Sequence, residues 1–190
     1  TRGAQSSVAI AKIVEEGQAR AVADAETERA ENARILADEP FSGRALARPG
    51  GVAAARAKLA ELRQSVTKSL AASQANADSM RTKLTALPMS ESRRAELLAE
   101  HDRGFAAGRA DGREGVEATE QVLDAVEGQL DVLSRTPRGW VVEAGEIAFI
   151  SERDMRDFNA KVRESQAAQA RVIAAQRATE ARDGASSPPS

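Results

Sequence analysis

Residues 98–133 read LAEHDRGFAAGRADGREGVEATEQVLDAVEGQLDVL. In this stretch apolar, aromatic or small side chains recur every three or four residues, with charged residues between them. A spacing near 3.6 residues places such side chains on one face of an α-helix. The stretch predicts one long amphipathic helix, whose inner face carries Leu98, His101, Phe105, Gly108, Gly112, Gly115, Thr119, Val122, Val126, Leu130 and Leu133.

Four glycines lie inside this helix, at positions 104, 108, 112 and 115. Each costs up to about 1 kcal/mol relative to alanine in a helix interior. No strand precedes them and no Gly-Lys-Ser/Thr ending follows, which argues against a phosphate-binding loop. Gly108 and Gly112 are therefore expected to be structural: either the helix breaks there, or a neighbouring helix packs closely against them. The remaining alternative is a flexible hinge that binds a partner.

Two helices are predicted before this one. The same spacing covers residues 5–37, and Pro40 then ends the helix because proline lacks a backbone donor and disfavours helix at the residue before it. A second helix runs from Val52 to Leu87 and stops at Pro88. Residues 51–90 carry a net charge of +4 and residues 91–150 carry −6, so the second and third helices are expected to attract each other as antiparallel neighbours.

The period changes after the third helix. Two short β-branched and aromatic runs flank Ala144-Gly145, which predicts a β-hairpin at about residues 140–150 with Gly145 in its turn. Ser151, with Asp154 three residues later, is expected to cap a last helix. The inner face of that helix is predicted to carry Met155, Phe158, Val162, Ser165, Gln169, Val172, Gln176 and Thr179.

Together these elements predict a mainly α protein: an elongated antiparallel four-helix bundle with one small β-hairpin between helices three and four. Residues 1–182 are expected to form a single helical-bundle domain, and residues 183–190, rich in Ser and Pro, a disordered C-terminal tail. No run reaches the roughly 20 apolar residues needed to cross a bilayer.

The composition supports closely packed helices and excludes several kinds of chemistry. Alanine accounts for 40 of the 190 residues, and the net charge is only −2, which argues against disorder. With no cysteine and one histidine, the chain has no thiol chemistry, no disulfide and no His cluster. Acidic pairs lack a second ligand type, so we expect no metal, no cofactor and no enzymatic activity. Scattered arginines and few aromatic residues argue against nucleic-acid binding.

His101 is the one residue that titrates near neutral pH, and Glu100 and Asp102 flank it. Adjacent positions on a helix do not face each other, so neither carboxylate is expected to orient the ring. The favoured interpretation is a half-buried histidine one turn from Phe105. The alternative is that His101 and Phe105 contact a ligand or partner.

Trp140 and Phe149 form the one aromatic concentration of the chain. In a hairpin they either pack onto the helices, which we favour, or present an apolar patch to a ligand or partner. These two residues, with His101 and Phe105, are therefore the candidate contact residues.

The segment from Gly139 to Val162 resembles the C-terminal signature of the YiaF-type lipoproteins, a family of unknown function from Gram-negative bacteria. The positions that carry the resemblance are Gly145, Ile147, Phe149, Ser151, Phe158 and Asn159. We expect Asn159, from its type and place, to hydrogen-bond the hairpin backbone.

The resemblance implies a cell-envelope or periplasmic location, with a signal peptide and a lipid-anchored cysteine ahead of residue 1. The expected function is accordingly a non-enzymatic envelope protein with a structural or partner-binding role. Its partner would be an unidentified envelope protein, and its only membrane contact the anchor. The alternative is a periplasmic sensor-type helical bundle that binds a small ligand beside His101 and Phe105.

Overall fold

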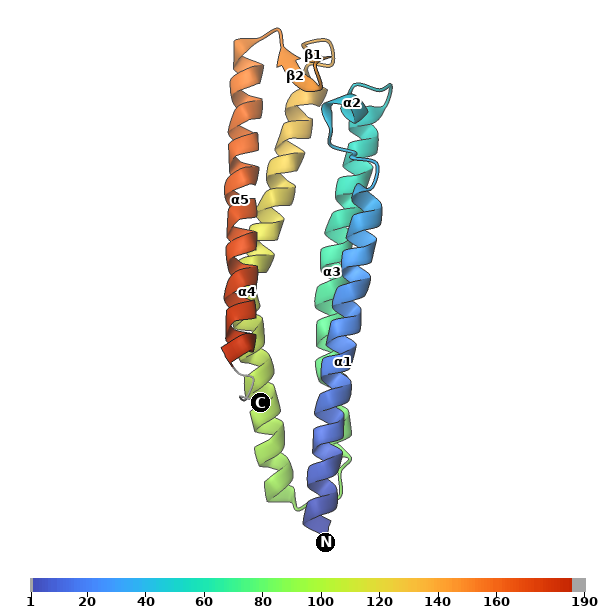
Figure 1. The fold of residues 1–190 in the computed structure, drawn as a ribbon, viewed down its shortest axis with the longest axis vertical. Coiled ribbons are helices and arrows are strands. Elements are labelled where there is room, and N and C mark those ends of the chain that lie inside the picture. The colour runs from blue at the N-terminus through green and yellow to red at the C-terminus, as the bar shows by residue number, and fades with distance from the viewer. Residues whose placement is uncertain (1, 186–190) are drawn as a thin grey trace. The chain divides into compact units, whose positions relative to one another are not determined.

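The computed structural model describes residues 2–185, and most of them are helical. Figure 1 shows long helices and one small hairpin. The elements in chain order are α1 (Arg2–Leu36), α2 (Gly43–Leu46), α3 (Gly51–Thr85), α4 (Glu91–Arg135), β1 (Trp140–Glu143), β2 (Glu146–Phe149) and α5 (Glu152–Ala185). The predicted mainly α class and the hairpin between the third and fourth long helices are confirmed, and the short helix α2 was not predicted.

The chain divides into two compact units, each built from two separate stretches. Unit 1 contains residues 1–32 and 65–110, and unit 2 contains residues 33–64 and 111–190. Each of α1, α3 and α4 contributes residues to both units. A single domain over residues 1–182 stays a prediction.

Unit 1 has a small apolar core shared by α1, α3 and α4. Its buried centre consists of Ile13, Leu84 and Leu97. A close contact between α1 and α3 adjoins it, where the Met80 side chain occupies the space that a Cβ on Gly17 would need. In the same contact, the buried Asn76 Nδ2 donates to the Gly17 carbonyl oxygen over 2.9 Å.

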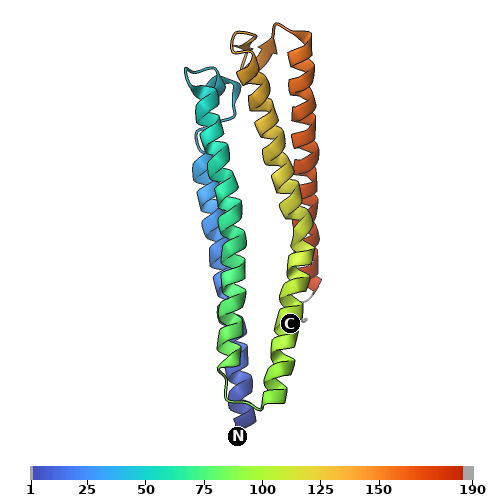
Figure 2. The same ribbon diagram turned by 180° about the vertical axis from the view of Figure 1, so that it is seen from behind.

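Unit 2 packs α4 against α5, and Figures 1 and 2 both show α5 beside the C-terminal half of α4. Leu130 and Leu133 of α4 are almost completely buried. Gln129 reaches across and donates to the Ser165 hydroxyl of α5 over 3.3 Å. Close packing at a glycine occurs here as well, because Lys161 covers Gly128.

Ion pairs join α3 to α4 inside each unit, as the opposite net charges of the two segments predicted. In unit 2, Arg63 Nη2 lies 2.8 Å from an Asp124 carboxylate oxygen and 2.7 Å from one of Glu127. In unit 1, Arg81 Nε lies 3.2 Å from Asp102 Oδ1. Exposed pairs of this kind contribute at most about 1 kcal/mol each, so they favour the pairing of these helices without being its main source of stability.

The hairpin pairs β1 with β2 in antiparallel register, with Trp140 opposite Phe149 and Glu143 opposite Glu146. Ala144 and Gly145 have φ values of 51° and 89°. Positive φ at both central residues is the backbone of a type I′ turn, whose twist matches that of the flanking strands. The predicted turn is thus confirmed, with an alanine where the backbone prefers asparagine or glycine.

The start of α5 follows the sequence prediction only in part. Ser151 caps the helix, because its hydroxyl accepts from the Asp154 backbone N–H over 3.4 Å. The predicted inner face is wrong at Gln169, Gln176 and Thr179, which are exposed. It is also wrong at Met155, which is 42% exposed, whereas Asp154 is buried and takes the place of Met155. The reason is that Arg135 and Thr136 at the end of α4 bond the Asp154 carboxylate and draw it inward.

Two further expectations about α5 need correction. Asn159 is exposed, and within residues 2–185 its side chain makes no hydrogen bond to the hairpin, so the bonding role expected for it is wrong. The helix also continues through positions 183–185, which were expected to begin a disordered tail. The rest of that tail, residues 186–190, lies outside the described residues.

Substituting the turn alanine tests the left-handed backbone. Ala144→Asn is expected to stabilise the protein by about 1 kcal/mol, because a left-handed conformation costs roughly that much for alanine and little for asparagine. Urea unfolding of both proteins measures the difference. Gly145→Ala provides the control and should lower the unfolding midpoint; a destabilising Ala144→Asn would contradict the turn geometry.

Candidate functional site

Unit 1 contains a pocket of about 630 Å³ between α1, α3 and α4. Its walls are mostly apolar and come from all three helices. The principal apolar side chains are Ile10 and Val14 of α1, Met80 and Leu84 of α3, and Leu97 and Phe105 of α4. Two of the four predicted contact residues, His101 and Phe105, therefore line a real cavity.

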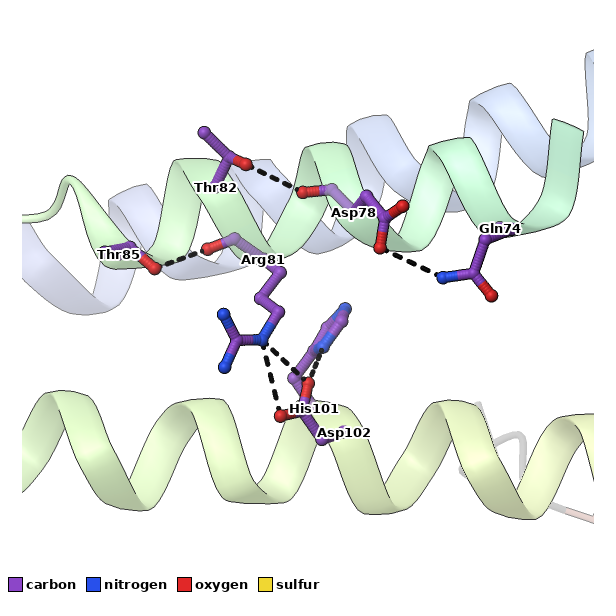
Figure 3. A network of polar contacts seen from close by, with 7 residues as sticks. All are labelled: Gln74, Asp78, Arg81, Thr82, Thr85, His101 and Asp102. Carbon is purple, nitrogen blue, oxygen red and sulfur yellow. Dashed lines mark hydrogen bonds and ion pairs between the residues drawn. The ribbon is translucent and has the colours of Figure 1, made fainter. Parts of the chain in front are cut away.

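The ring of His101 stands between α3 and α4 and is 12% exposed. Figure 3 shows its contact with Asp102, in which Nδ1 lies 3.2 Å from Asp102 Oδ1. The expectation that neither flanking carboxylate would meet the ring is wrong for Asp102. Arg81 of α3 explains the difference, because its Nε lies 3.2 Å and 3.4 Å from the two carboxylate oxygens and holds Asp102 beside the ring.

Asp102 determines which nitrogen of the ring carries the proton. Its hydrogen bond with His101, followed by that with Arg81, lowers the pKa of the Asp102 carboxyl below its usual value. The carboxylate is therefore ionised at neutral pH and can only accept a hydrogen bond. In the neutral imidazole, Nδ1 must then carry the proton, which leaves Nε2 as an acceptor.

The other polar side chains of the pocket are Asn76, Arg93, Glu100, Gln18 and Ser73, and they differ in how they are paired. Asn76 is engaged with the Gly17 carbonyl, as described above. Arg93 forms an ion pair with Glu96 over 3.3 Å. Glu100 is exposed at the pocket, and its carboxylate has no hydrogen bond or ion pair with any residue of the described chain.

Phe105 is half-buried at the same wall, and the Arg109 guanidinium lies 5.9 Å from the centre of its ring. A cation at this distance from an aromatic face is weakly attracted to it. Arg109 also donates to the Gln74 side-chain carbonyl over 3.3 Å, so α4 is tied to α3 beside the ring.

The glycines of α4 do not act as the sequence suggested. The helix runs unbroken from Glu91 to Arg135. A Cβ placed on Gly108 or Gly112 would meet no atom within 4 Å among the residues that the structure covers, so the expected close helix contact at these positions is wrong. Close contacts form at Gly17 and Gly128 instead, since opposing side chains and not glycine spacing decide where helices approach.

The other two predicted contact residues lie in unit 2. Trp140 Nε1 donates to the Leu133 carbonyl oxygen over 3.1 Å, and the rings of Phe149 and Phe158 lie 5.2 Å apart. Both aromatic residues of the hairpin thus pack onto α4 and α5, which was the favoured interpretation. The outer face of the hairpin leaves Val141 and Ile150 49% and 77% exposed.

Several residues that line the pocket were not among the predicted site residues, among them Met80, Asn76 and Glu100. Met80 lies within the helix predicted from Val52 to Leu87, but the sequence does not show that Gly17 of α1 leaves space for its side chain. Glu100 was weighed only as a neighbour of His101. The i, i+3, i+4, i+7 spacing of Leu97, Glu100, His101 and Gly104 was the available signal, because it puts all four on one side of α4.

Across residues 2–185, no cluster of three or more His, Asp or Glu side chains is arranged to hold a metal ion. Over the same residues, no helix combines the length and apolarity that a membrane span requires.

Comparisons with known proteins identify no relative of this chain. No protein-family model, no curated protein and no solved structure matches this chain significantly. The resemblance to the YiaF-type lipoproteins therefore rests on the sequence motif alone.

Because His101 is the single histidine, its protonation is directly observable. We expect ¹⁵N NMR at pH 8 to show the tautomer with the proton on Nδ1, because the Asp102 carboxylate accepts from that nitrogen. Asp102→Asn should shift the equilibrium towards the Nε2-protonated form. The matched control Asp111→Asn, also on α4, should leave the ¹⁵N shifts unchanged. An Nε2-protonated ring in the unmodified protein would contradict the geometry.

Proposed function

We propose that this chain is a non-enzymatic helical binding protein of the cell envelope, and that the pocket of unit 1 is its binding site. The observation that carries the proposal is the apolar cavity between α1, α3 and α4. Its volume of about 630 Å³ lies within the range of roughly 300–1,000 Å³ that is typical of small-molecule sites. A sensor-type bundle that binds a small ligand is thus favoured over a purely structural role.

The chemistry of the walls supports a binding role. Six large apolar side chains and two alanines line the pocket beside six polar side chains, so the wall combines apolar surface with polar groups that can orient a ligand. Met80 contributes an unbranched thioether that adapts to different shapes. Gly17, on the opposite helix, gives this side chain room, so the wall of the pocket can adjust to a ligand.

The second candidate is a partner-binding envelope protein that acts through its surface. The observation in its favour is the exposure of two apolar residues at the hairpin, Val141 of β1 and Ile150 directly after β2. Exposed apolar residues that gather on one face are typical of protein contacts. This candidate predicts binding that depends on the hairpin and not on the pocket.

We further propose that α1, α3, α4 and α5 form one antiparallel four-helix bundle. Ion pairs within each unit support it, since they link α1 to α3 at Glu16 and Lys83, and α3 to α4 at Arg56 and Asp131.

Spin labels on cysteines introduced at Thr27 of α1 and Ile173 of α5 test the arrangement. Neighbouring helices in a bundle lie about 8–10 Å apart, so a short, narrow distance distribution is expected.

The cell-envelope location rests on the resemblance to the YiaF-type lipoproteins, which implies a lipid anchor. Fractionation of cells that produce the native full-length protein tests this location. We expect the processed protein in the periplasm or with the membranes. Full-length, unprocessed protein in the cytoplasm would contradict the proposed location.

Filling the pocket separates the two candidates. Ala21 lines the pocket, and Ala21→Trp should weaken binding of the neutral apolar dye Nile red at least about tenfold by occupying its space. Val22→Trp is the matched control, because Val22 is 60% exposed and lies outside the pocket lining. Dye fluorescence titrations measure both affinities, and circular dichroism checks folding. Equal binding by the two variants would contradict the pocket as the site.

A further inference from the structure

We propose that the pocket of unit 1 takes an apolar amine: a ligand with a hydrocarbon or aromatic body and one protonated amino group. This inference rests on the proposed function, because it names the class of ligand for the same site. The amino group would lie at the α4 wall, against Glu100 and His101, and the apolar body against α1 and α3.

The apolar body is required by the walls. Ile10, Val14, Met80 and Leu84 offer no hydrogen-bonding group beyond the weakly accepting sulfur of Met80. A charged or strongly polar group placed among them would lose its hydration without compensation, which is costly. Gln18 of α1 and Ser73 and Asn76 of α3 also line the pocket but carry no charge, so among the lining residues a charged ligand group meets charged side chains only on α4.

The polar end is specified by His101. Asp102 occupies the Nδ1 side of the ring, and Figure 3 shows the imidazole directed from α4 towards α3 with its other nitrogen away from Asp102. That second nitrogen, Nε2, is an acceptor in the neutral ring. It can accept from an ammonium or hydroxyl group, whereas a carboxylate offers it nothing to accept.

Charge then selects an ammonium over a hydroxyl. Two charged residues line the pocket, Arg93 and Glu100. Arg93 already has a carboxylate partner, Glu96, 3.3 Å away. Glu100 has no such partner within the described part of the chain, so the charge that remains uncompensated at the pocket is negative. An ammonium ion would meet one attractive carboxylate and one acceptor nitrogen, while a carboxylate ligand would meet repulsion.

Isothermal titration calorimetry on the full chain at pH 8 tests the ligand class with three probes on one skeleton. The probes are 2-naphthylethylamine, 2-naphthylethanol and 2-naphthylacetic acid. We expect the amine to bind about fivefold more tightly than the alcohol, which is the effect of one partly exposed ion pair, and the acid to bind most weakly.

Glu100→Gln should remove that preference, lowering the affinity for the amine about fivefold while leaving the alcohol unchanged. Because Glu100 is exposed, the variant is expected to fold. Glu117→Gln is the matched control: it removes one exposed negative charge from α4 outside the pocket lining and should change neither affinity. His101→Phe should weaken the amine and the alcohol alike, because it keeps a ring but removes the acceptor.

The outcomes distinguish this inference from the proposed function. If the acid binds as tightly as the amine, or if Glu100→Gln leaves amine binding intact, the ligand class is wrong. If no naphthyl probe binds but Nile red does so in an Ala21-dependent manner, the pocket stands and the amine inference fails. If neither the probes nor Nile red bind, the proposed function fails with it.

Discussion

The close approach of helices at small side chains is the constraint on which this structure depends. Ala55 of α3 and Ala118 of α4 are completely buried, and a chain so rich in alanine has few large apolar groups to fill wider gaps. A cavity or gap in such a core forfeits dispersion contacts that nothing else replaces. The helices must therefore run near one another wherever the core is to be continuous. Paired charges such as Arg63 with Asp124 and Glu127 then favour one alignment of these similar surfaces over others.

The same constraint accounts for the pocket. In unit 1, Gly17 of α1 lies opposite Met80 of α3. The flexible methionine side chain therefore forms the wall of the pocket where a Cβ at position 17 would otherwise stand. Further along, Gly104 contributes no side chain to the lining at all. Small residues that permit close packing in one place thus leave unfilled volume in another, depending on whether a long side chain lies opposite. His101, ordered by Asp102 and Arg81, gives that volume a polar wall with a defined direction.

Local signals were sufficient for the elements but not for the site. The period of apolar residues, the prolines and Ser151 lie in short stretches of chain, so they predicted the long helices, the hairpin and the cap of α5. The role of Gly108, the contact between His101 and Asp102, and the burial of Asp154 all depend on residues from another helix. The pairing of His101 with Asp102 illustrates the reason: neighbours on a helix diverge, and only Arg81, about twenty positions away, brings the carboxylate to the ring. Such distant partners are set by the alignment of whole helices, which no single segment encodes.

The anchoring of Trp140 to the Leu133 carbonyl has a practical consequence for the two units. Trp140 is the single tryptophan, and the chain contains no tyrosine, so its intrinsic fluorescence reports on unit 2 alone. The single histidine lies in unit 1. The protein thus carries one natural spectroscopic reporter in each unit, and the melting of the two halves can be followed separately without attaching any label.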